Sequence, residues 1–351
     1  VDTREQPPGL EQARSLLGDR CTVGPDVRVS WDAVGRVVVS PGLSLEHPLL
    51  QSARQAGVPV LGELALFAGV ATAPVIAVTG SNGKSTVCTL LAAMLSASGL
   101  RVAVGGNLGP AALDLLTDPE PELYVLEVSS FQLEAAGGFR PALATVLNVS
   151  PDHLDRHGSM EAYAAVKQRI FAADTRRVLN RGDERVRRMA DAGSDVIWFG
   201  TDRPVDGGYG VIPGDDGDWL AVDSEPLLPV SCMQMRGRHN LANALAALAL
   251  AERAGADRAA CLSALQAYPG LPHRMEPVAS DDGLTWINDS KATNVGAAAA
   301  ALAGLDRPCV LLAGGQGKGQ DFSSLAAAID RRRVRAVVVY GKDGPALQDA
   351  L

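Results

Sequence analysis

Short apolar runs separated by helix-like stretches recur along most of the 351-residue chain. The runs that predict strands occupy residues 37–39, 75–79, 123–128, 144–149, 310–313 and 334–340. Strands that alternate with helices form βαβ units, whose strands are parallel. The run from Val75 to Val78 is apolar at every position, which is typical of a strand covered on both faces. The pattern therefore predicts an α/β protein built on parallel sheets.

Breaks in this pattern predict three domains, at residues 1–63, 64–270 and 271–351. The first boundary precedes the first long strand, and the second lies where a Pro-Gly-Leu-Pro segment begins at Pro269. Residues 201–230 differ from the rest because they are rich in Gly, Asp and Pro, with a short strand candidate at 219–222. They predict a small antiparallel addition to the middle domain.

Composition narrows the class of protein. A hydrophobic content of 47% over this length is enough for several cores. The net charge of -8, with both signs interspersed, excludes a basic surface for nucleic acid or for a membrane. The five cysteines form no CxxC pair, which argues against a zinc site or a disulfide framework and favours a reducing cytoplasm. The most apolar helical stretch, 241–251, is too short to span a bilayer. A cytoplasmic protein with a small-molecule substrate fits best.

Neither end of the chain has the features typical of the end of a complete protein. Val1 is followed by neither an initiator methionine nor an apolar signal segment, and a helix-like stretch stops at Leu351 with no further element. We therefore expect a chain that begins and ends within a longer protein.

The strand at 75–79 runs directly into a glycine-rich segment and then into an apolar-periodic helix. The segment consists of Gly80, Ser81, Asn82, Gly83, Lys84, Ser85 and Thr86. Such a loop aims backbone N–H groups and a helix N-terminus at phosphate oxygens, its lysine reaches the outer phosphates, and its hydroxyls can bind Mg²⁺. The strict GxxxxGK[ST] pattern fails because its first glycine would fall at Val78. The alternative is an ordinary glycine-rich turn, but the context favours a shortened phosphate loop.

Acidic and histidine side chains follow the next two strands. Glu127 lies near the carboxyl end of its strand, where open α/β sheets bind ligands, and it either meets a bound cation or reaches solvent. His153 and His157 lie in a Pro-directed loop after the strand at 144–149 and are either site residues or solvated loop residues. Lys167 lies on a predicted helix at 160–173, where a lone lysine is usually solvated, so the residue pattern alone does not select it.

Taken together, these segments resemble the Mur ligase family over nearly the whole chain. The resemblance rests on the loop with Thr79 before it and on motif blocks that follow in the family's order, at residues 105–107, 127–132, 148–156, 237–243 and 271–274. Within the family, residues 287–294 resemble the glutamate-adding branch, whereas alanine- and diaminopimelate-adding relatives usually carry a histidine there. Folylpolyglutamate synthetases share the fold but typically have Gly where Ser85 stands.

The resemblance implies an architecture and an activity. It implies a partial N-terminal Rossmann-like domain for the UDP-substrate, a central ATP-binding domain and a partial C-terminal Rossmann-like domain for glutamate. The expected substrates are UDP-N-acetylmuramoyl-L-alanine and D-glutamate, which are joined through an acyl phosphate in peptidoglycan precursor synthesis. The protein is expected to act as a monomer. The alternatives are an L-glutamate-adding ligase, a folylpolyglutamate synthetase-like enzyme, or an inactive nucleotide-binding fragment.

The resemblance also implies roles for matching residues. ATP would meet residues 80–86, including Lys84, together with Asn240, Asn243, Arg274 and Asp289. Of two Mg²⁺ ions, Ser85 would bind one and Glu127 and His153 the other, beside Lys167, which matches a lysine that the family carbamylates. Substrate contacts are implied for Thr3, Arg4, Asn107, Ser130, Gln132, Lys291 and Thr293. Catalysis would depend on Lys84, His153, Lys167 and Lys291, with His153 alternatively a general base.

Two departures from the family pattern concern the ends. The opening strand and glycine-rich loop of the first domain precede the point where this chain starts, and the third domain stops before a Ser-containing motif and an aromatic residue that usually hold glutamate. We therefore expect the 351-residue chain by itself to be inactive or nearly so.

Overall fold

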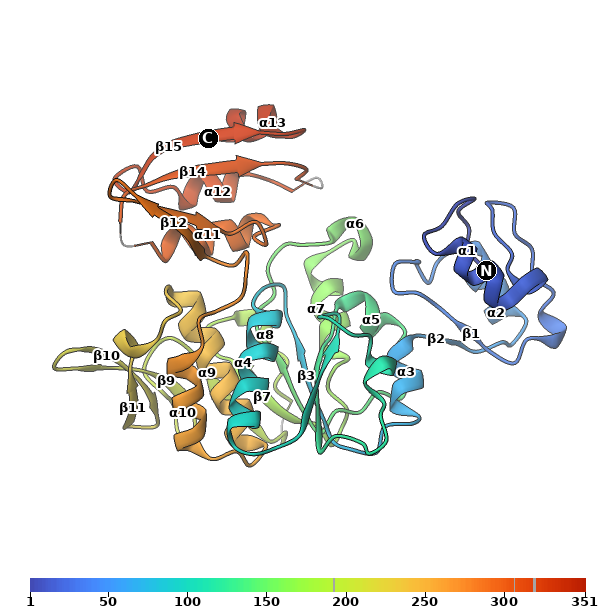
Figure 1. Ribbon diagram of the computed structural model, residues 1–351, viewed down its shortest axis with the longest axis horizontal. Helices are drawn as coiled ribbons and strands as arrows, with labels where there is room; N and C mark the ends of the chain where they lie inside the picture. The colour runs from blue at the N-terminus through green and yellow to red at the C-terminus, as the bar shows by residue number, and fades with distance from the viewer. Residues whose placement is uncertain (192, 306, 318–319) are drawn as a thin grey trace.

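A nine-stranded sheet forms the centre of the protein in the computed structural model, which describes residues 1–191, 193–305, 307–317 and 320–351 (Figure 1). The strand order is β11-β10-β9-β8-β7-β6-β3-β5-β4. The parallel part comprises β3 (Val75–Thr79), β4 (Val102–Gly106), β5 (Leu123–Glu127), β6 (Leu143–Val146), β7 (Arg176–Asn180), β8 (Val196–Phe199) and β9 (Tyr209–Gly214). The predicted α/β class with a parallel sheet is thus confirmed.

The glycine-rich segment after residue 200 extends this sheet with antiparallel strands. They are β10 (Gly217–Val222), which pairs with β9, and β11 (Glu225–Pro229), which pairs with β10. The predicted antiparallel addition is confirmed, and because β8 pairs with β9 it is continuous with the central sheet.

Helices cover both faces of the central sheet because successive strand residues point to opposite sides. On one face, Ile76 and Val78 of β3 pack with α4 (Lys84–Ala97), α9 (Arg238–Arg253) and α10 (Arg258–Ala267). On the other, Val75 and Ala77 share a core with α3 (Glu63–Ala68), α5 (Ser130–Glu134) and α7 (Met160–Gln168). Short helices α6 (Leu154–His157) and α8 (Glu184–Arg187) follow the carboxyl ends of β6 and β7.

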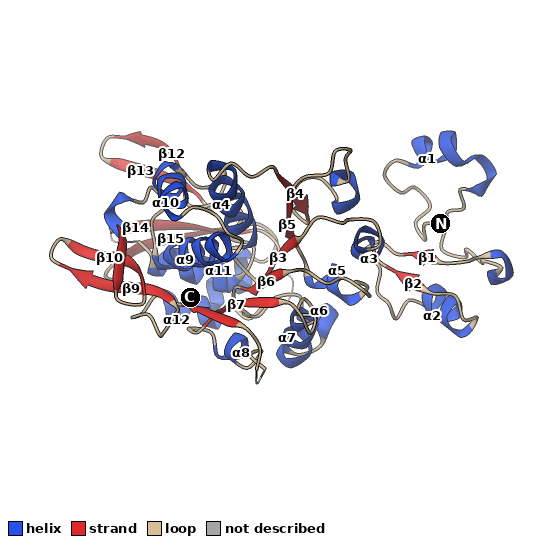
Figure 2. Cartoon of the chain, turned by 90° about the horizontal axis from the view of Figure 1, so that it is seen from below, coloured by secondary structure: helices blue, strands red, loops and turns tan. Residues whose placement is uncertain are grey.

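The N-terminal elements form a small separate layer beside α3 (Figure 2). They comprise α1 (Leu10–Leu17), α2 (Pro48–Gln55) and the parallel pair β1 (Val37–Val38) and β2 (Val60–Leu61). Single 3₁₀ turns occur at Gly18–Arg20, Trp31–Ala33, Ala112–Leu115 and Val230–Cys232. The residue before α3 is hydrogen-bonded to the segment after α5, because Gly62 N–H donates to the carbonyl of Ala135 at 2.8 Å.

The C-terminal elements have their own core, which includes Leu302, Leu325 and Leu347. They are the hairpin β12 (Glu276–Asp281) and β13 (Leu284–Asn288), the parallel pair β14 (Cys309–Gly314) and β15 (Val334–Tyr340), and the helices α11 (Val295–Ala303), α12 (Ser323–Ala328) and α13 (Gly344–Ala350). Among the described residues, no helix combines the length and apolarity needed to cross a bilayer.

Candidate active site

The glycine-rich loop lies between β3 and α4, where the sequence predicts it. Gly83 is the N-cap of α4 and has φ +87°, a conformation that side-chain-bearing residues rarely adopt. The Lys84 Nζ donates to the carbonyls of Gly80 and Ser81, both at 3.0 Å, so the lysine folds back over the loop. Burial lowers the pKa of Lys84, and the carboxylates of Glu127 and Asp152 oppose this shift. The loop thus combines a helix N-terminus with a cation, as phosphate binding requires.

The end of β6 braces this loop. The Asn148 side chain accepts from Asn82 N–H at 2.8 Å and donates to the Asn82 carbonyl at 3.0 Å. Ser81 Oγ donates to the carbonyl of Ser150 at 3.0 Å and accepts from its N–H at the same distance. The backbone of the loop is therefore fixed by the neighbouring strand end.

Glu127 is buried, with 3% of its surface exposed, so the alternative that it reaches solvent is wrong. One carboxylate oxygen accepts from Ser85 Oγ at 2.7 Å and the other from Asn107 Nδ2 at 2.7 Å. Arg274 Nη2 donates to the same Ser85 hydroxyl at 3.2 Å. Residues predicted for metal, nucleotide and substrate binding therefore meet at one carboxylate.

Lys167 is almost fully buried at 1% exposure, so the expectation of a solvated lysine on this helix is wrong. Its Nζ donates to the Gly80 carbonyl at 3.0 Å and lies 4.4 Å from the centre of the Tyr163 ring. Tyr163 and Lys167 are one helical turn apart, which puts both on the face of α7 that packs against the loop. Burial, reinforced by the positive charge of Lys84, holds the pKa of Lys167 well below its usual range.

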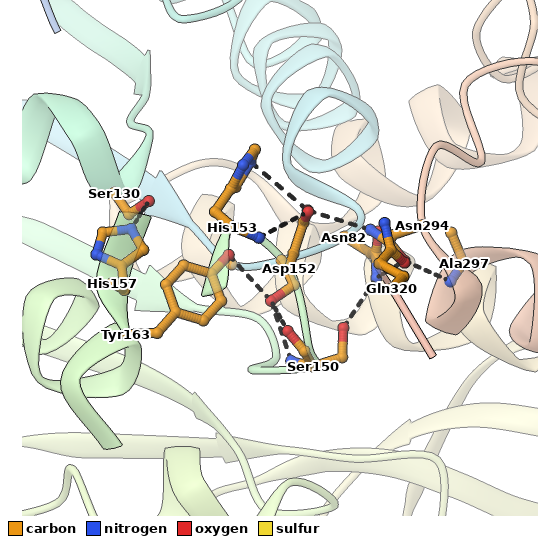
Figure 3. Close-up of polar contacts among 12 residues, drawn as sticks. Asn82, Ser130, Ser150, Asp152, His153, His157, Tyr163, Asn294, Ala297 and Gln320 are labelled. Atoms are coloured by element: carbon orange, nitrogen blue, oxygen red, sulfur yellow. Dashed lines mark hydrogen bonds and ion pairs between the residues drawn. The ribbon is translucent and has the colours of Figure 1, made fainter. Parts of the chain in front are cut away.

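The two histidines after β6 differ in environment (Figure 3). The His153 side chain is 35% exposed, with Nε2 at 3.6 Å from Asp152 Oδ2, and its ring lies against Phe131 at 4.8 Å. The His157 side chain is only 3% exposed and stacks between Phe131 and Tyr163, with ring centres at 5.7 and 5.0 Å. The solvated alternative is therefore wrong for His157, whereas His153 is partly exposed beside Asp152.

Two residues expected to contact substrate have structural partners. Ser130 Oγ lies 3.0 Å from His157 Nε2. The side-chain Oε1 of Gln132 accepts from Ser129 N–H at 2.9 Å and completes a capping box at the start of α5. Both residues nevertheless lie on the segment that follows Glu127, next to the site.

Asn240 and Asn243, which the resemblance assigns to ATP, lie on α9 next to the loop. Asn243 Nδ2 donates to Asn240 Oδ1 at 3.1 Å, and Asn240 Nδ2 donates to the Arg236 carbonyl at 2.9 Å. The Asn243 side chain abuts Gly83, where a Cβ atom would overlap its oxygen.

The remaining predicted residues lie farther from the loop. Asp289 accepts from Met275 N–H at 3.1 Å, and burial raises the pKa of its carboxyl group. Lys291 and Thr293 are exposed on the segment that leads to α11. Thr3 and Arg4 belong to the N-terminal layer, where Arg4 pairs with Asp2 at 2.7 Å. The structure does not bring these last two residues to the loop.

Three further residues contact this site without having been singled out for a role in the sequence. Tyr163 covers Lys167, Asn294 contacts Asn82, and Arg156 joins the loop after β6 to Glu134 at 2.6 Å. Arg156 and Asn294 stand inside motif blocks of the family, which is the signal that could have indicated them. Nothing in the local pattern distinguishes Tyr163.

The residues present fit Mg²⁺. Within the described residues, no three or more His, Cys, Asp or Glu side chains form a preformed metal site. Mg²⁺ does not need such a site, because it usually keeps several waters and takes one or two carboxylates plus phosphate oxygens. The buried Glu127 carboxylate and the Ser85 hydroxyl beside it supply hard oxygen ligands at the mouth of the phosphate loop.

Comparison with known proteins shows similarity along the entire chain. Residues 1–62 match the Mur ligase MurD-like N-terminal domain, residues 78–251 the Mur ligase middle domain, and residues 273–351 the Mur ligase glutamate ligase domain. The chain is 48% identical to the UDP-N-acetylmuramoylalanine--D-glutamate ligase of Hahella chejuensis, over 100% of this chain and 79% of the relative. It is 47% identical to the ligase of the same name from Methylococcus capsulatus, over 100% of this chain and 76% of the relative.

Solved structures share the fold at lower sequence identity. The UDP-N-acetylmuramate-alanine ligase of Thermotoga maritima matches with a TM-score of 0.62 and 21% identity, over 99% of this chain and 81% of that one. A pseudomurein peptide ligase type C from Methanothermus fervidus matches with a TM-score of 0.60 and 17% identity, over 99% of this chain and 84% of that one. Together with the three family models that match the chain in order, these matches confirm the predicted Mur ligase fold.

Proposed function

The chain belongs to the Mur ligase family, and from this premise we propose that it joins D-glutamate to UDP-N-acetylmuramoyl-L-alanine at the expense of ATP. Relatives at 44–48% identity over the whole chain carry the name of this ligase. The observation that carries the proposal is the convergence of Lys84 and Lys167 on one loop carbonyl, with Glu127 beside Ser85. This reading is favoured over a polyglutamate synthetase, an L-glutamate-adding ligase and a non-catalytic fragment.

The reaction needs a site that gathers several anions. A carboxylate does not form an amide at neutral pH until one oxygen becomes a leaving group. The alanine carboxylate of the muramoyl substrate takes the γ-phosphoryl group of ATP, which gives an acyl phosphate and ADP. The glutamate amine then attacks the acyl carbon, loses a proton and expels inorganic phosphate.

Charge neutralisation is the main contribution expected of this site to phosphoryl transfer. The ammonium group of Lys84 lies over the loop and donates to two of its carbonyls. When ATP binds, the same group can donate to phosphate oxygens instead. Bound Mg²⁺ would neutralise phosphate charge next to Ser85 and Glu127. Asn107 holds the second oxygen of Glu127 and so orients that carboxylate toward the loop.

Lys167 is proposed to carry a carbamate. Two ammonium groups that donate to the same carbonyl repel one another, and the lowered pKa of Lys167 favours its neutral amine. A neutral amine adds to CO₂ with loss of a proton, which gives an anionic oxygen ligand. The like-charge pair with Lys84 then becomes an opposite-charge pair beside the proposed second Mg²⁺. ¹³C-labelled bicarbonate should give a carbamate signal that Lys167→Arg lacks.

Further roles and properties are proposed on the basis of the family motifs. His153 is assigned to the second metal ion or to the glutamate amine as a base. The assignments to substrate are Thr3, Arg4, Asn107, Ser130, Gln132, Lys291 and Thr293, and those to nucleotide are residues 80–86, Asn240, Asn243, Arg274 and Asp289. We further propose domains at 1–63, 64–270 and 271–351, and a monomer that works in the cytoplasm.

Phosphate release with UDP-N-acetylmuramoyl-L-alanine and ATP tests the function. It is measured with D-glutamate, with L-glutamate, and with folate in place of the muramoyl substrate, on this chain and on a version extended at both ends to the length of its relatives. Release that depends on D-glutamate in the extended version supports the proposal. Release with L-glutamate or folate alone, or ATP binding without turnover in both versions, contradicts it.

A further inference from the structure

Asn294 joins the C-terminal elements to the phosphate loop (Figure 3). It is the N-cap of α11, where its Oδ1 accepts from Ala297 N–H at 2.8 Å. Its Nδ2 donates to Asn82 Oδ1 at 3.0 Å and to Asp152 Oδ2 at 3.3 Å. One side chain therefore stabilises a helix of the C-terminal part and contacts two segments of the central part.

The surroundings make this contact specific. Asn294 is 7% exposed, and both hydrogens of its amide have partners. If α11 shifted, these buried amide hydrogens would lose their partners, and each unsatisfied donor would cost free energy. The contact therefore favours the one position of α11 in which both hydrogens are bonded. Its partner Asn82 cannot follow a displacement of α11, because Asn148 holds the Asn82 backbone from both sides.

The rest of α11 also lies directly on the central part. A Cβ atom on Gly296 would lie 3.3 Å from Ser150 Oγ, and one on Gly304 would lie 3.1 Å from the Cα atom of Gly237. The helix therefore contacts the loop after β6 with its first turn, and its C-cap Gly304 lies against Gly237, the N-cap of α9. Asn294 is the polar contact that fixes its register between them.

We propose that Asn294 is a positioning residue that sets the C-terminal part relative to the phosphate loop for nucleotide binding and acyl phosphate formation. This inference rests on the proposed function, in which Lys291 and Thr293 of the same segment approach the reacting groups. Asn294 touches neither ATP nor substrate in this scheme, because its amide is used by Asn82, Asp152 and Ala297. It acts through Asn82, and so through the loop that binds phosphate.

The helix-capping role and the positioning role can be separated by mutation. Asn294→Asp keeps an oxygen for Ala297 N–H but removes both donors and adds a negative charge beside Asp152. Gln320→Ala is the matched control, because Gln320 Oε1 accepts from Val295 N–H at 2.9 Å at the start of the same helix. Asn294→Ala removes cap and contact together.

Melting temperature, ATP dissociation constant by calorimetry and ATP KM are measured for each variant in the version extended at both ends. Asn294→Asp should lower the melting temperature, because it loses two buried hydrogen bonds and places a carboxylate beside Asp152. It should also weaken ATP binding about tenfold or more, because the C-terminal part is no longer held in register with the phosphate loop. Gln320→Ala should lower the melting temperature and leave ATP binding unchanged. Asn294→Ala should show both losses.

Wild-type ATP affinity and KM in Asn294→Asp would overturn the inference, as would an equal loss of affinity in Gln320→Ala. The binding measurement requires no turnover, so it decides the role of Asn294 independently of the reaction. Absence of D-glutamate-dependent phosphate release in the wild-type extended version would instead contradict the proposed function. The two failures are therefore distinguishable.

Discussion

The substitution Gly83→Ala tests whether the loop and the residues behind it are built as one unit. Gly83 has φ +87°, and a Cβ atom there would overlap the side-chain oxygen of Asn243. Gly99, just beyond the other end of α4, has the same φ of +87° but no atom within 4 Å of its Cβ position. The two glycines share the backbone conformation and differ in the space available, so Gly99→Ala is a matched control.

The expected losses of stability follow from the backbone conformation and from the space around the added methyl group. A left-handed backbone costs a residue with a side chain about 1–2 kcal/mol, so Gly99→Ala should lose about that much free energy of unfolding. Forcing an extra methyl group into packed surroundings adds about 1–3 kcal/mol. Gly83→Ala should therefore lose about 2–5 kcal/mol. ATP binding should weaken for Gly83→Ala alone, because Gly83 borders the phosphate-binding backbone.

Urea denaturation and calorimetric titration with ATP measure the two quantities. Asn243→Ala removes the overlapping oxygen, so it should relieve the clash when combined with Gly83→Ala, although by itself it loses the hydrogen bond to Asn240. A double-mutant cycle isolates the coupling between the two sites, expected at about 1–3 kcal/mol. Equal losses for Gly83→Ala and Gly99→Ala, together with no coupling to Asn243, would refute the reasoning.

Three further predictions concern the surroundings of the loop. In the version extended at both ends, Lys84→Ala should reduce ADP formation by at least about 10²-fold while the fold is kept, because it removes the cation over the loop; near-normal turnover would exclude the loop from the mechanism. Arg156→Lys should loosen the N-terminal layer, because it loses the forked contact with Glu134 and the 3.1 Å bond to the Leu43 carbonyl, and faster proteolysis before residue 62 measures this. Burial lowers the pKa of His157, so the unfolded chain binds the proton more tightly and stability should fall as pH drops below about 6.5. His157→Gln should flatten that slope between about pH 5 and 6.5, and an unchanged slope contradicts the assignment.

The regular elements of the middle part were largely predictable from local pattern. The strands at 75–79 and 334–340 have the predicted limits, because each run is rich in β-branched residues and is followed directly by a glycine. The strand predicted at 144–149 ends earlier, at Val146, because the Asn148 side chain bonds to the loop. β7 was missed because Arg176 and Arg177 open it and hide its apolar residues.

Within the site, the sequence by itself determined the groups whose chemistry is local. A strand, tight glycines, a lysine and a helix start are consecutive in the chain, so the phosphate loop follows from residues 75–86 alone. Glu127 could be placed at the same sheet edge because parallel strands end together.

Only the tertiary structure decided which polar residues are buried and paired. The packing of α7 against the loop turns Lys167 from an ordinary surface lysine into a buried amine beside Lys84. The docking of α11, more than two hundred residues along the chain from Asn82, creates the contacts of Asn294. Burial and charge proximity depend on elements distant in sequence, and no local pattern of hydrophobic and polar residues encodes them.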